Sequence, residues 1–402
     1  MKWVNALSKR PSLEAAIAEV ANTARDTLET APDLGLVFIS SAFASEYPRL
    51  MPLLQEQLDI PTLIGCGGGG VVGSSPDTPA EEIERFPALS LTLASLPEAT
   101  AKGFHIAPED LPDLDSSPDR WVELIGVSPQ DNPHFILLAD PSLSKVNDLL
   151  EGLDFAYPNA EKIGGLASAG FSNRGMSLFC NGELYEGGTV GVALSGNIVL
   201  DSIVAQGCRP IGDPYRIARS DRNIVLELED STGGEAQPPL EALRELVQTL
   251  SEADRKLAQT SLFIGVVRDE FKQQLERGDF LIRNLLGVDP RVGAIAVGDR
   301  IRPGQRIQFH LRDAKASAED LEMLLQRYNR TCETSPVGAL MFACLGRGEG
   351  LYGKPNFDSE LVRQYLGDLP ISGFFCNGEI GPVGGATFLH GYTSVLGICR
   401  PA

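Results

Sequence analysis

Two copies of the pentapeptide Phe-Cys-Asn-Gly-Glu carry the residues of this sequence best suited to chemistry, and they begin 196 residues apart in a chain of 402. A thiol can act as a nucleophile, an amide can donate and accept hydrogen bonds, and a carboxylate can hold a cation. Asn-Gly between apolar stretches is typical of a hairpin turn, so we expect two equivalent hairpins with the cysteine and the glutamate close together. The candidate residues are Cys180, Asn181 and Glu183 in the first copy and Cys376, Asn377 and Glu379 in the second.

Charged side chains near these motifs suggest how a small ligand could be bound. The guanidinium of Arg347 could bind a carboxylate through its planar fork, and Glu379 or Glu183 could bind an ammonium group. Such a pair would suit an amino acid zwitterion. Structural alternatives stay open, because Arg347 could pair with a neighbouring glutamate, Glu379 included, and each glutamate could accept bonds from the amides of its own turn. For Asn181 and Asn377, turn formation is favoured over ligand contact.

An alternative function is that of a cysteine-dependent hydrolase or transferase acting on a small amide or ester. Cys376 or Cys344 would then attack the substrate, with His390 as the base and Glu379 orienting it. However, the glutamate three residues after Cys376 and the two preceding phenylalanines both favour a raised thiol pKa. We therefore predict that Cys376 is not a catalytic nucleophile, and we expect no catalytic residues.

Three segments with the same order of elements surround the candidate residues. In each, an apolar run predicts a buried strand, a helix follows, and a second strand leads into glycines. The segments are 34–39, 50–58 and 61–70; 134–139, 142–153 and 162–170; and 338–344, 359–366 and 370–373. The first two glycine stretches lack the lysine of a phosphate-binding loop, so close packing between layers explains them better than nucleotide binding. We expect these three units to form a repeat.

The half-length offset between the two pentapeptides indicates an internal duplication. Glycines and prolines cluster at 207–222, where the two halves would meet. We therefore predict an α/β fold of two similar tandem halves, each a mixed β-sheet layered with helices. The predicted domains are 1–215 and 216–402, with a ligand cleft where they meet.

The C-terminal part carries a distinctive order of residues over 339–353, 371–382 and 388–392. The order is a cysteine, Arg-Gly, an aromatic residue with Gly, Gly-x-x-Cys-x-Gly-Glu, and His-Gly. This pattern resembles the FIST family, a sensory domain with an N-terminal and a C-terminal part, and residues 34–195 match its N-terminal part more loosely. The resemblance implies sensing of a small molecule, with amino acids or their derivatives as the proposed ligands, and it implies no catalytic mechanism. We expect a standalone form, with no kinase, cyclase, methyl-acceptor or F-box segment, that has a signalling partner protein.

The composition argues against several classes of partner. The chain has 34 basic and 54 acidic residues and a formal net charge of −20, so we expect it to bind neither nucleic acid nor a membrane surface. Its apolar runs are far shorter than the roughly 18 residues that cross a bilayer, and we see no signal peptide, so we expect a cytoplasmic protein. Seven cysteines without a CxxC pair and four histidines without a metal-binding spacing predict reduced thiols, no metal and no cofactor. A third class of function, a protein-interaction scaffold, would present an exposed apolar patch without a deep pocket.

Overall fold

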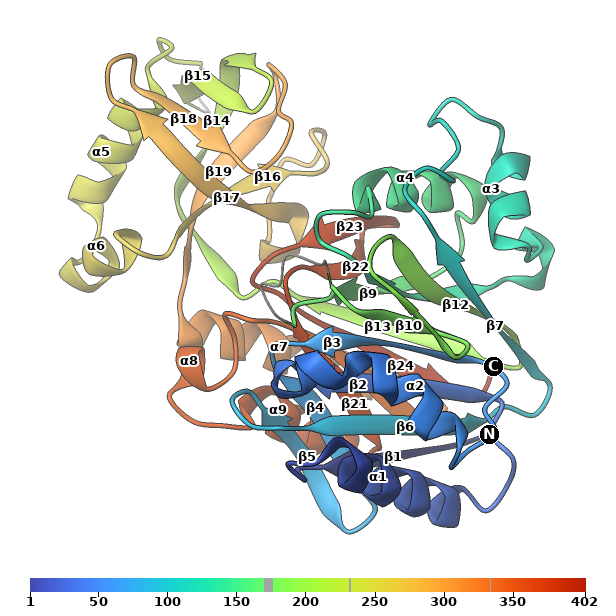
Figure 1. Cartoon of the computed structure of the whole chain (residues 1–402). Helices are drawn as coiled ribbons and strands as arrows, with labels where there is room; N and C mark the ends of the chain where they lie inside the picture. Colours follow the sequence, from blue (N-terminus) through green and yellow to red (C-terminus); the bar gives the residue numbers. More distant parts are fainter. Residues whose placement is uncertain (170–175, 231–232, 333) are drawn as a thin grey trace. The chain divides into compact units, whose positions relative to one another are not determined.

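The computed structural model describes residues 1–169, 176–230, 233–332 and 334–402, which form two compact units (Figure 1). The larger unit contains residues 1–205 and 321–402, and the smaller unit contains residues 206–320. Each unit has hydrophobic clusters of its own. The predicted mixed α/β class is confirmed, because mixed sheets are layered with helices.

Three sheets of six strands each make up the larger unit. We call them the first sheet (β1-β6-β2-β3-β10-β11), the second sheet (β7-β12-β8-β9-β22-β23) and the third sheet (β13-β24-β20-β21-β4-β5). Along the chain, the strands and helices fall into three runs. The first run is β1 (Lys2–Ser8), α1 (Leu13–Leu28), β2 (Leu34–Ser40), α2 (Tyr47–Gln55), β3 (Leu63–Gly68), β4 (Val71–Ser75), β5 (Thr78–Ile83) and β6 (Leu89–Ser95). The second run is β7 (Ala99–Ile106), α3 (Pro118–Ile125), β8 (His134–Ala139), α4 (Val146–Ala156), β9 (Lys162–Leu166), β10 (Leu178–Cys180), β11 (Glu183–Tyr185) and β12 (Thr189–Gly196). The third run is β13 (Val199–Ala205), then, after the smaller unit, the end of α7 (Ala314–Thr331), β20 (Gly338–Cys344), α8 (Glu349–Tyr352), α9 (Phe357–Leu366), β21 (Ile371–Cys376), β22 (Glu379–Val383), β23 (Ala386–His390) and β24 (Ser394–Arg400).

The three runs are structural repeats, which confirms the repeat of three strand–helix–strand segments. Each repeat holds one parallel pair joined by a helix, namely β2 with β3, β8 with β9, and β20 with β21. An antiparallel strand from the same repeat then pairs with the first strand of the pair. One hydrogen bond recurs in all three repeats. The amides of Ser40, Asp140 and Cys344 each donate a hydrogen bond of 2.9 Å to the carbonyl of the residue just before that antiparallel strand.

A hairpin from each repeat crosses into the sheet of another repeat. Strand β4 of the first repeat, with β5, pairs with β21 in the third sheet. Strand β10 of the second repeat, with β11, pairs with β3 in the first sheet. Strand β22 of the third repeat, with β23, pairs with β9 in the second sheet. The exchange is cyclic, so every sheet of the larger unit contains strands from two repeats.

The prediction that the two pentapeptides form equivalent hairpins is wrong. The first copy is a hairpin, in which Cys180 pairs with Glu183, and Asn181 and Gly182 have φ angles of 48° and 94°. The second copy instead joins β21 of the third sheet to β22 of the second sheet, and neither Asn377 nor Gly378 has a positive φ. Asn-Gly signals a local change of direction, but the following strand's partner depends on packing elsewhere in the fold.

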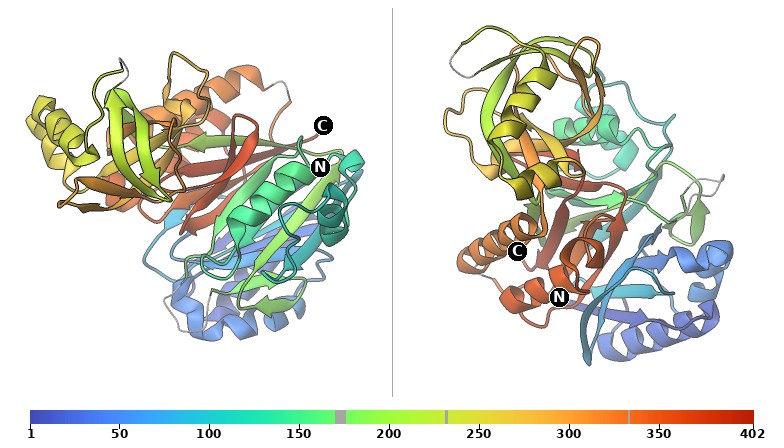
Figure 2. Two further views of the ribbon diagram at one scale, coloured as in Figure 1. Left: turned by 90° about the horizontal axis from the view of Figure 1, so that it is seen from above. Right: turned by 90° about the vertical axis from the view of Figure 1, so that its left-hand side faces the viewer.

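Helices cover the outer faces of the sheets, and the inner faces share one core (Figure 2). Helices α1 and α2 pack on the first sheet, α3 and α4 on the second, and α9 with the end of α7 on the third. Ser12 caps the N-terminus of α1, because its hydroxyl accepts a hydrogen bond from the amide of Ala15. In the described part of the chain, no helix combines the length and apolar character needed to cross a membrane.

Glycines allow the strands of the larger unit to approach closely, as the sequence indicates. Gly65, Gly164 and Gly373 hold the same position in the second strand of each parallel pair, where a Cβ would run into a backbone carbonyl of the first strand. In the glycine stretch after β3, a Cβ at Gly69 would meet Leu345 of the third repeat. These glycines are therefore explained by packing between strands and repeats.

The smaller unit is a closed barrel with the strand order β14-β15-β18-β17-β16-β19. Its elements are β14 (Cys208–Asp221), β15 (Ile224–Asp230), α5 (Pro239–Thr249), α6 (Glu252–Ala258), β16 (Leu262–Val267), β17 (Phe280–Asp289), β18 (Ala294–Val297), β19 (Arg306–Arg312) and the start of α7. Apolar residues of the strands and of α5 form its core. Closure of the barrel leaves no free sheet edge among these strands.

Candidate functional site

The C-terminal ends of β20 and β21 bring together the candidate residues of the third repeat. Cys344 and Cys376 are partners in the parallel register of these two strands. The chain turns away directly after each strand, and the amide of Leu345 donates to the carbonyl of Cys376 over 3.0 Å. Ligands of α/β proteins commonly bind at this end of parallel strands. Three neighbouring residues are accessible here, because Asn377 and Leu345 are exposed and Cys344 is partly exposed.

Cys376 is fully buried beside three other candidate or core side chains. Burial first, and then Glu379, Cys66 and Cys344, raise the pKa of the Cys376 thiol well above its usual range. Its Sγ lies 3.5 Å from the carbonyl oxygen of Phe374. The structure thus agrees with the predicted effect of the glutamate and the phenylalanines on this thiol, and a thiol in this state is a poor nucleophile near neutral pH.

Glu379 is a buried carboxylate at the start of β22, and it organises the neighbouring loop. One of its oxygens accepts a hydrogen bond of 3.0 Å from the amide of Thr393, whose carbonyl in turn accepts from the amide of Cys344. His390 faces Glu379 in the antiparallel register of β22 and β23, and its Nε2 lies 3.0 Å from the carbonyl oxygen of Gly381. Thr393, just before β24, therefore links Glu379 to Cys344, and His390 joins them through the pairing of β22 with β23.

Arg347 forms a buried ion pair, but its partner is an aspartate that the sequence analysis did not single out. The guanidinium makes two hydrogen bonds to Asp358 at the start of α9, of 2.7 and 3.0 Å. It also donates to the hydroxyl of Tyr352 over 2.6 Å. With a residue exposure of only 1%, Arg347 stabilises the turn after β20 through these bonds.

Glu82 extends this cluster with a carboxylate from the first repeat. It accepts a 2.7 Å hydrogen bond from the amide of Ser359, and its own amide donates to the side chain of Asn356. Burial, together with the charge of Asp358, raises the pKa of Glu82 to about 7. Sequence reasoning missed Glu82 because more than 260 residues separate it from its partners. Sequence reasoning could have found Tyr352, because it lies within the stretch that carries the family resemblance.

The candidate residues of the first pentapeptide lie in a different place. The backbone and side chain of Asn181 bond to Leu63 at the start of β3, and its φ of 48° is that of a turn residue. Burial raises the pKa of Cys180 to about 11, and Glu183 is exposed. The first copy thus lies beside the N-terminal end of a parallel strand, and the second copy continues from the C-terminal end of another.

A serine that sequence reasoning passed over joins the three repeats near the candidate residues. The hydroxyl of Ser168, after β9, accepts a 2.8 Å hydrogen bond from the amide of Gly69 and donates to the carbonyl of Phe375. The amide of Phe375 in turn donates to Gly70 over 3.0 Å. Gly170, the last residue of the predicted glycine stretch 162–170, lies outside the described part of the chain. The glycine amide at 69 is occupied by protein, which supports packing over phosphate binding.

This arrangement defines an α/β protein of three interlocked sheets with a cluster of motif residues at the end of one parallel pair. Models of two sensory-type domains match the sequence, the FIST N domain over residues 33–231 and the FIST C domain over residues 239–382. The chain belongs to the FIST family. The two matches follow one another along the chain as the predicted two halves do, while the limits 1–215 and 216–402 stay a prediction.

Proteins from mycobacteria and a plant are similar to this chain. An uncharacterized protein of Mycobacterium tuberculosis is 35% identical over 98% of both chains, and one of Mycobacterium bovis is 33% identical over 96% of both. An F-box/LRR-repeat protein of Arabidopsis thaliana is 32% identical over 24% of this chain and 22% of its own length. Among solved structures, a cyanuric acid hydrolase from A. caulinodans aligns over 99% of both chains with 9% identity and a TM-score of 0.31, which is too low to support an inference.

Proposed function

We propose that this chain is a sensory protein that binds a small ligand, an amino acid or a derivative, at the C-terminal ends of β20 and β21. The observation that carries the proposal is the gathering of Cys344, Arg347, Cys376, Asn377, Glu379 and His390 around these two strand ends. The cytoplasm is the expected compartment, and a partner protein would receive the signal.

The proposed contacts follow from which groups are accessible. Asn377 is exposed and its amide can both donate to a carboxylate and accept from an ammonium group. Cys344 and Leu345 would provide the wall next to Asn377, and the buried carboxylate of Glu379 would add negative charge beneath the surface of the site. Arg347 would act by holding the turn between Leu345 and α8, because its guanidinium is already bonded to Asp358.

The ligand can be sought by mass spectrometry of small molecules that co-purify with the native protein, followed by a thermal-shift assay with the twenty amino acids. A ligand at a hundred times its dissociation constant stabilises a protein by about 2.7 kcal/mol, which such an assay detects. We expect Asn377→Ala to remove the ligand-induced shift. Asn22→Ala, on the exposed side of α1, should keep it. An equal shift in both variants would place the site elsewhere.

A thiol-labelling experiment separates this proposal from the cysteine-dependent hydrolase or transferase. Iodoacetamide at pH 7 should modify the partly exposed Cys332 and Cys344 before the buried Cys376. Peptide mapping reads out all seven cysteines. Fast and selective modification of Cys376 would show a thiolate that burial does not suppress, and it would favour the enzyme with His390 as its base.

A further inference from the structure

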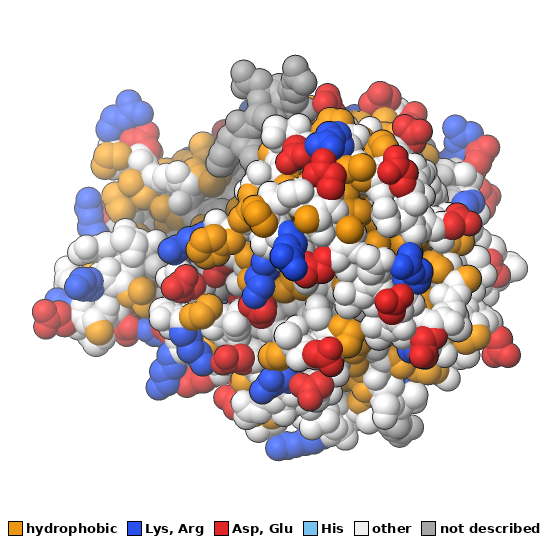
Figure 3. Space-filling view, turned by 60° about the horizontal axis from the view of Figure 1, so that its bottom comes forward, with side chains coloured by type: hydrophobic (Ala, Val, Ile, Leu, Met, Phe, Trp, Pro, Cys, Tyr) orange, Lys and Arg blue, Asp and Glu red, His pale blue; other side chains and the backbone are white. Residues whose placement is uncertain are grey.

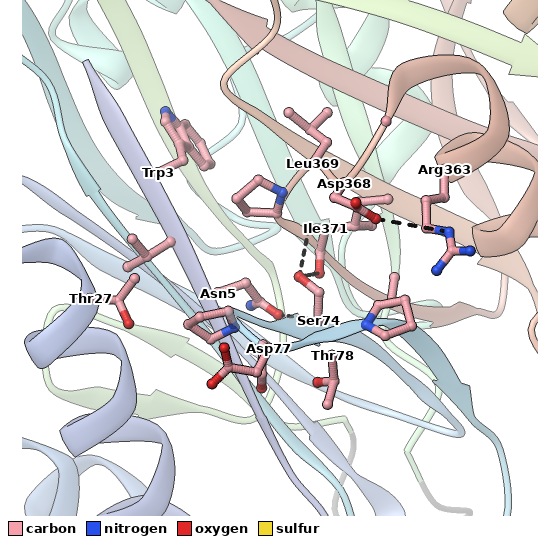
Figure 4. Close-up of a pocket in the computed structure, with 17 residues that line it drawn as sticks. Trp3, Asn5, Thr27, Ser74, Asp77, Thr78, Arg363, Asp368, Leu369 and Ile371 are labelled. Carbon is pink, nitrogen blue, oxygen red and sulfur yellow. Dashed lines mark hydrogen bonds and ion pairs between the residues drawn. The ribbon is translucent and has the colours of Figure 1, made fainter.

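A pocket of about 460 Å³ lies in the larger unit, where the first and third sheets meet (Figure 4). Its walls come from β1, the end of α1, the turn between β4 and β5, and the loop from α9 to β21. Volumes of this size are typical of small-molecule sites. The pocket adjoins the N-terminal end of β21, whereas the proposed sensory site is at its C-terminal end, about 17 Å away at the usual strand rise.

At the floor of the pocket, Asn5 and Ser74 belong to a network of buried polar groups. The side chain of Asn5 accepts from the amide of Ser74 over 2.6 Å and donates to the hydroxyls of Ser90 and Thr92. Thr92 continues to Ser372 over 2.7 Å. Because these bonds join β1, β4, β6 and β21, the floor is held in place without a ligand.

Several backbone groups in the walls offer hydrogen-bond acceptors without a free donor. Pro76, Pro79 and Pro370 line the pocket and have no amide hydrogen. The amides of Ser74, Leu369 and Ile371 also belong to the lining, and each already donates within the protein. A ligand that donates hydrogen bonds therefore fits this backbone better than one that accepts them, while side-chain donors of the lining belong to Trp3, Ser75, Thr78 and Arg363.

Charge and apolar surface narrow the class of ligand further. Asp77 and Asp368 supply two carboxylates, while Arg363 is the basic residue among those lining the pocket and lies 3.9 Å from Asp368. In Figure 4, Asp77 lies beside Asn5 and Ser74, and Trp3 and Leu369 form the opposite wall. Both side chains can pack against an apolar body, and the indole can also attract a cation.

We propose that this pocket is a second binding site, which takes a small organic amine with an apolar body. The ammonium group bonds to Asp77 and the neighbouring carbonyls, and the body packs against Trp3 and Leu369. The site goes beyond the proposed sensory function, since none of the residues proposed for that function lines it.

Three probes with one aromatic body test the proposal on the full chain. Tyramine carries an ammonium group, 4-hydroxyphenylacetate a carboxylate, and 4-ethylphenol no charge. The affinity of each probe is measured by calorimetry at physiological salt, because the salt screens the general attraction of an acidic protein for cations. We expect tyramine to bind about tenfold more tightly than either other probe, as charge-assisted hydrogen bonds predict. Similar affinities for all three probes, or no binding of tyramine, would overturn the proposal.

Matched variants and the fluorine resonances of the two tryptophans test where tyramine binds. Asp77→Asn should weaken tyramine binding about tenfold, whereas Asp59→Asn, which removes the same charge from an exposed position outside the pocket, should leave it unchanged. With 5-fluorotryptophan, the fluorine resonance of Trp3 should shift on binding and that of Trp121, a buried residue of α3, should not. Equal weakening in both variants, or a shift confined to Trp121, would exclude this pocket.

Discussion

The buried guanidinium of Arg347 is bonded to the carboxylate of Asp358 and the hydroxyl of Tyr352. Its removal should therefore affect the stability of the fold. Truncation leaves Asp358 buried without its cation, which costs about 3–5 kcal/mol. We therefore expect Arg347→Ala to lower the free energy of unfolding by that amount in urea titrations. Arg120→Ala, at a side chain that is 67% exposed, should change it by less than about 0.5 kcal/mol. A small effect of Arg347→Ala that coincides with lost ligand binding would instead make this arginine a direct ligand contact.

Glu82 makes stability depend on pH in the direction opposite to an exposed ion pair. Its folded-state pKa of about 7 exceeds that of an unfolded glutamate, so the folded state binds the proton more tightly. The protonated Glu82 adds about 3 kcal/mol to the free energy of unfolding. This contribution is complete below about pH 4.5 and is lost as the pH rises to about 7. Glu82→Gln, which keeps the shape and stays neutral, should flatten this part of the stability profile. An unchanged slope in Glu82→Gln would assign this pH dependence to other groups.

At the scale of elements, the strand–helix–strand segments could be predicted because their signals are local. Apolar runs and glycines mark β2, β3, β8, β9, β20 and β21, and the structure places all six in parallel pairs. Strand exchange could not be predicted, because hydrogen-bond partners of β4, β10 and β22 lie in other repeats. The same limit explains the two pentapeptides, which are identical in sequence and different in pairing. Glu82 was missed because it meets Ser359 and Asp358 only through this exchange.

Gly165 tests the contact between the second and third repeats. A Cβ at this position would overlap the Sγ of Cys376, and the backbone of Gly165 is open to other residues because its φ is not positive. We expect Gly165→Ala to cost about 1–3 kcal/mol through overpacking. The cost should shrink in a Cys376→Ala background, where the sulfur is gone, and thermal unfolding of the four combinations measures the coupling. Gly278→Ala, with no atoms within 4 Å of its Cβ, is the control. Additive effects of the pair would refute the contact.

At the scale of the whole molecule, charge is distributed unequally between the two units. Residues 206–320 hold 19 acidic and 17 basic side chains, which leaves 35 acidic and 17 basic for the larger unit. On the face shown in Figure 3, acidic and basic side chains are interspersed. The net charge of −20 is thus carried almost entirely by the three interlocked sheets, whose acidic surface opposes binding of polyanions.

The separate cores of the two units predict two unfolding transitions in the full chain. The barrel closes around its own cluster, and the larger unit is bound together by exchanged hairpins, so each should unfold cooperatively. Ile264→Ala in the barrel core and Leu137→Ala in the second sheet each remove a fully buried side chain, at about 2–5 kcal/mol. We expect each variant to lower one calorimetric transition by several degrees and leave the other in place, because the removed contacts belong to one core. Hydrogen exchange would then accelerate only in the matching unit. A single transition lowered by both variants would show that helix α7, which runs through residues of both units, couples them into one cooperative structure.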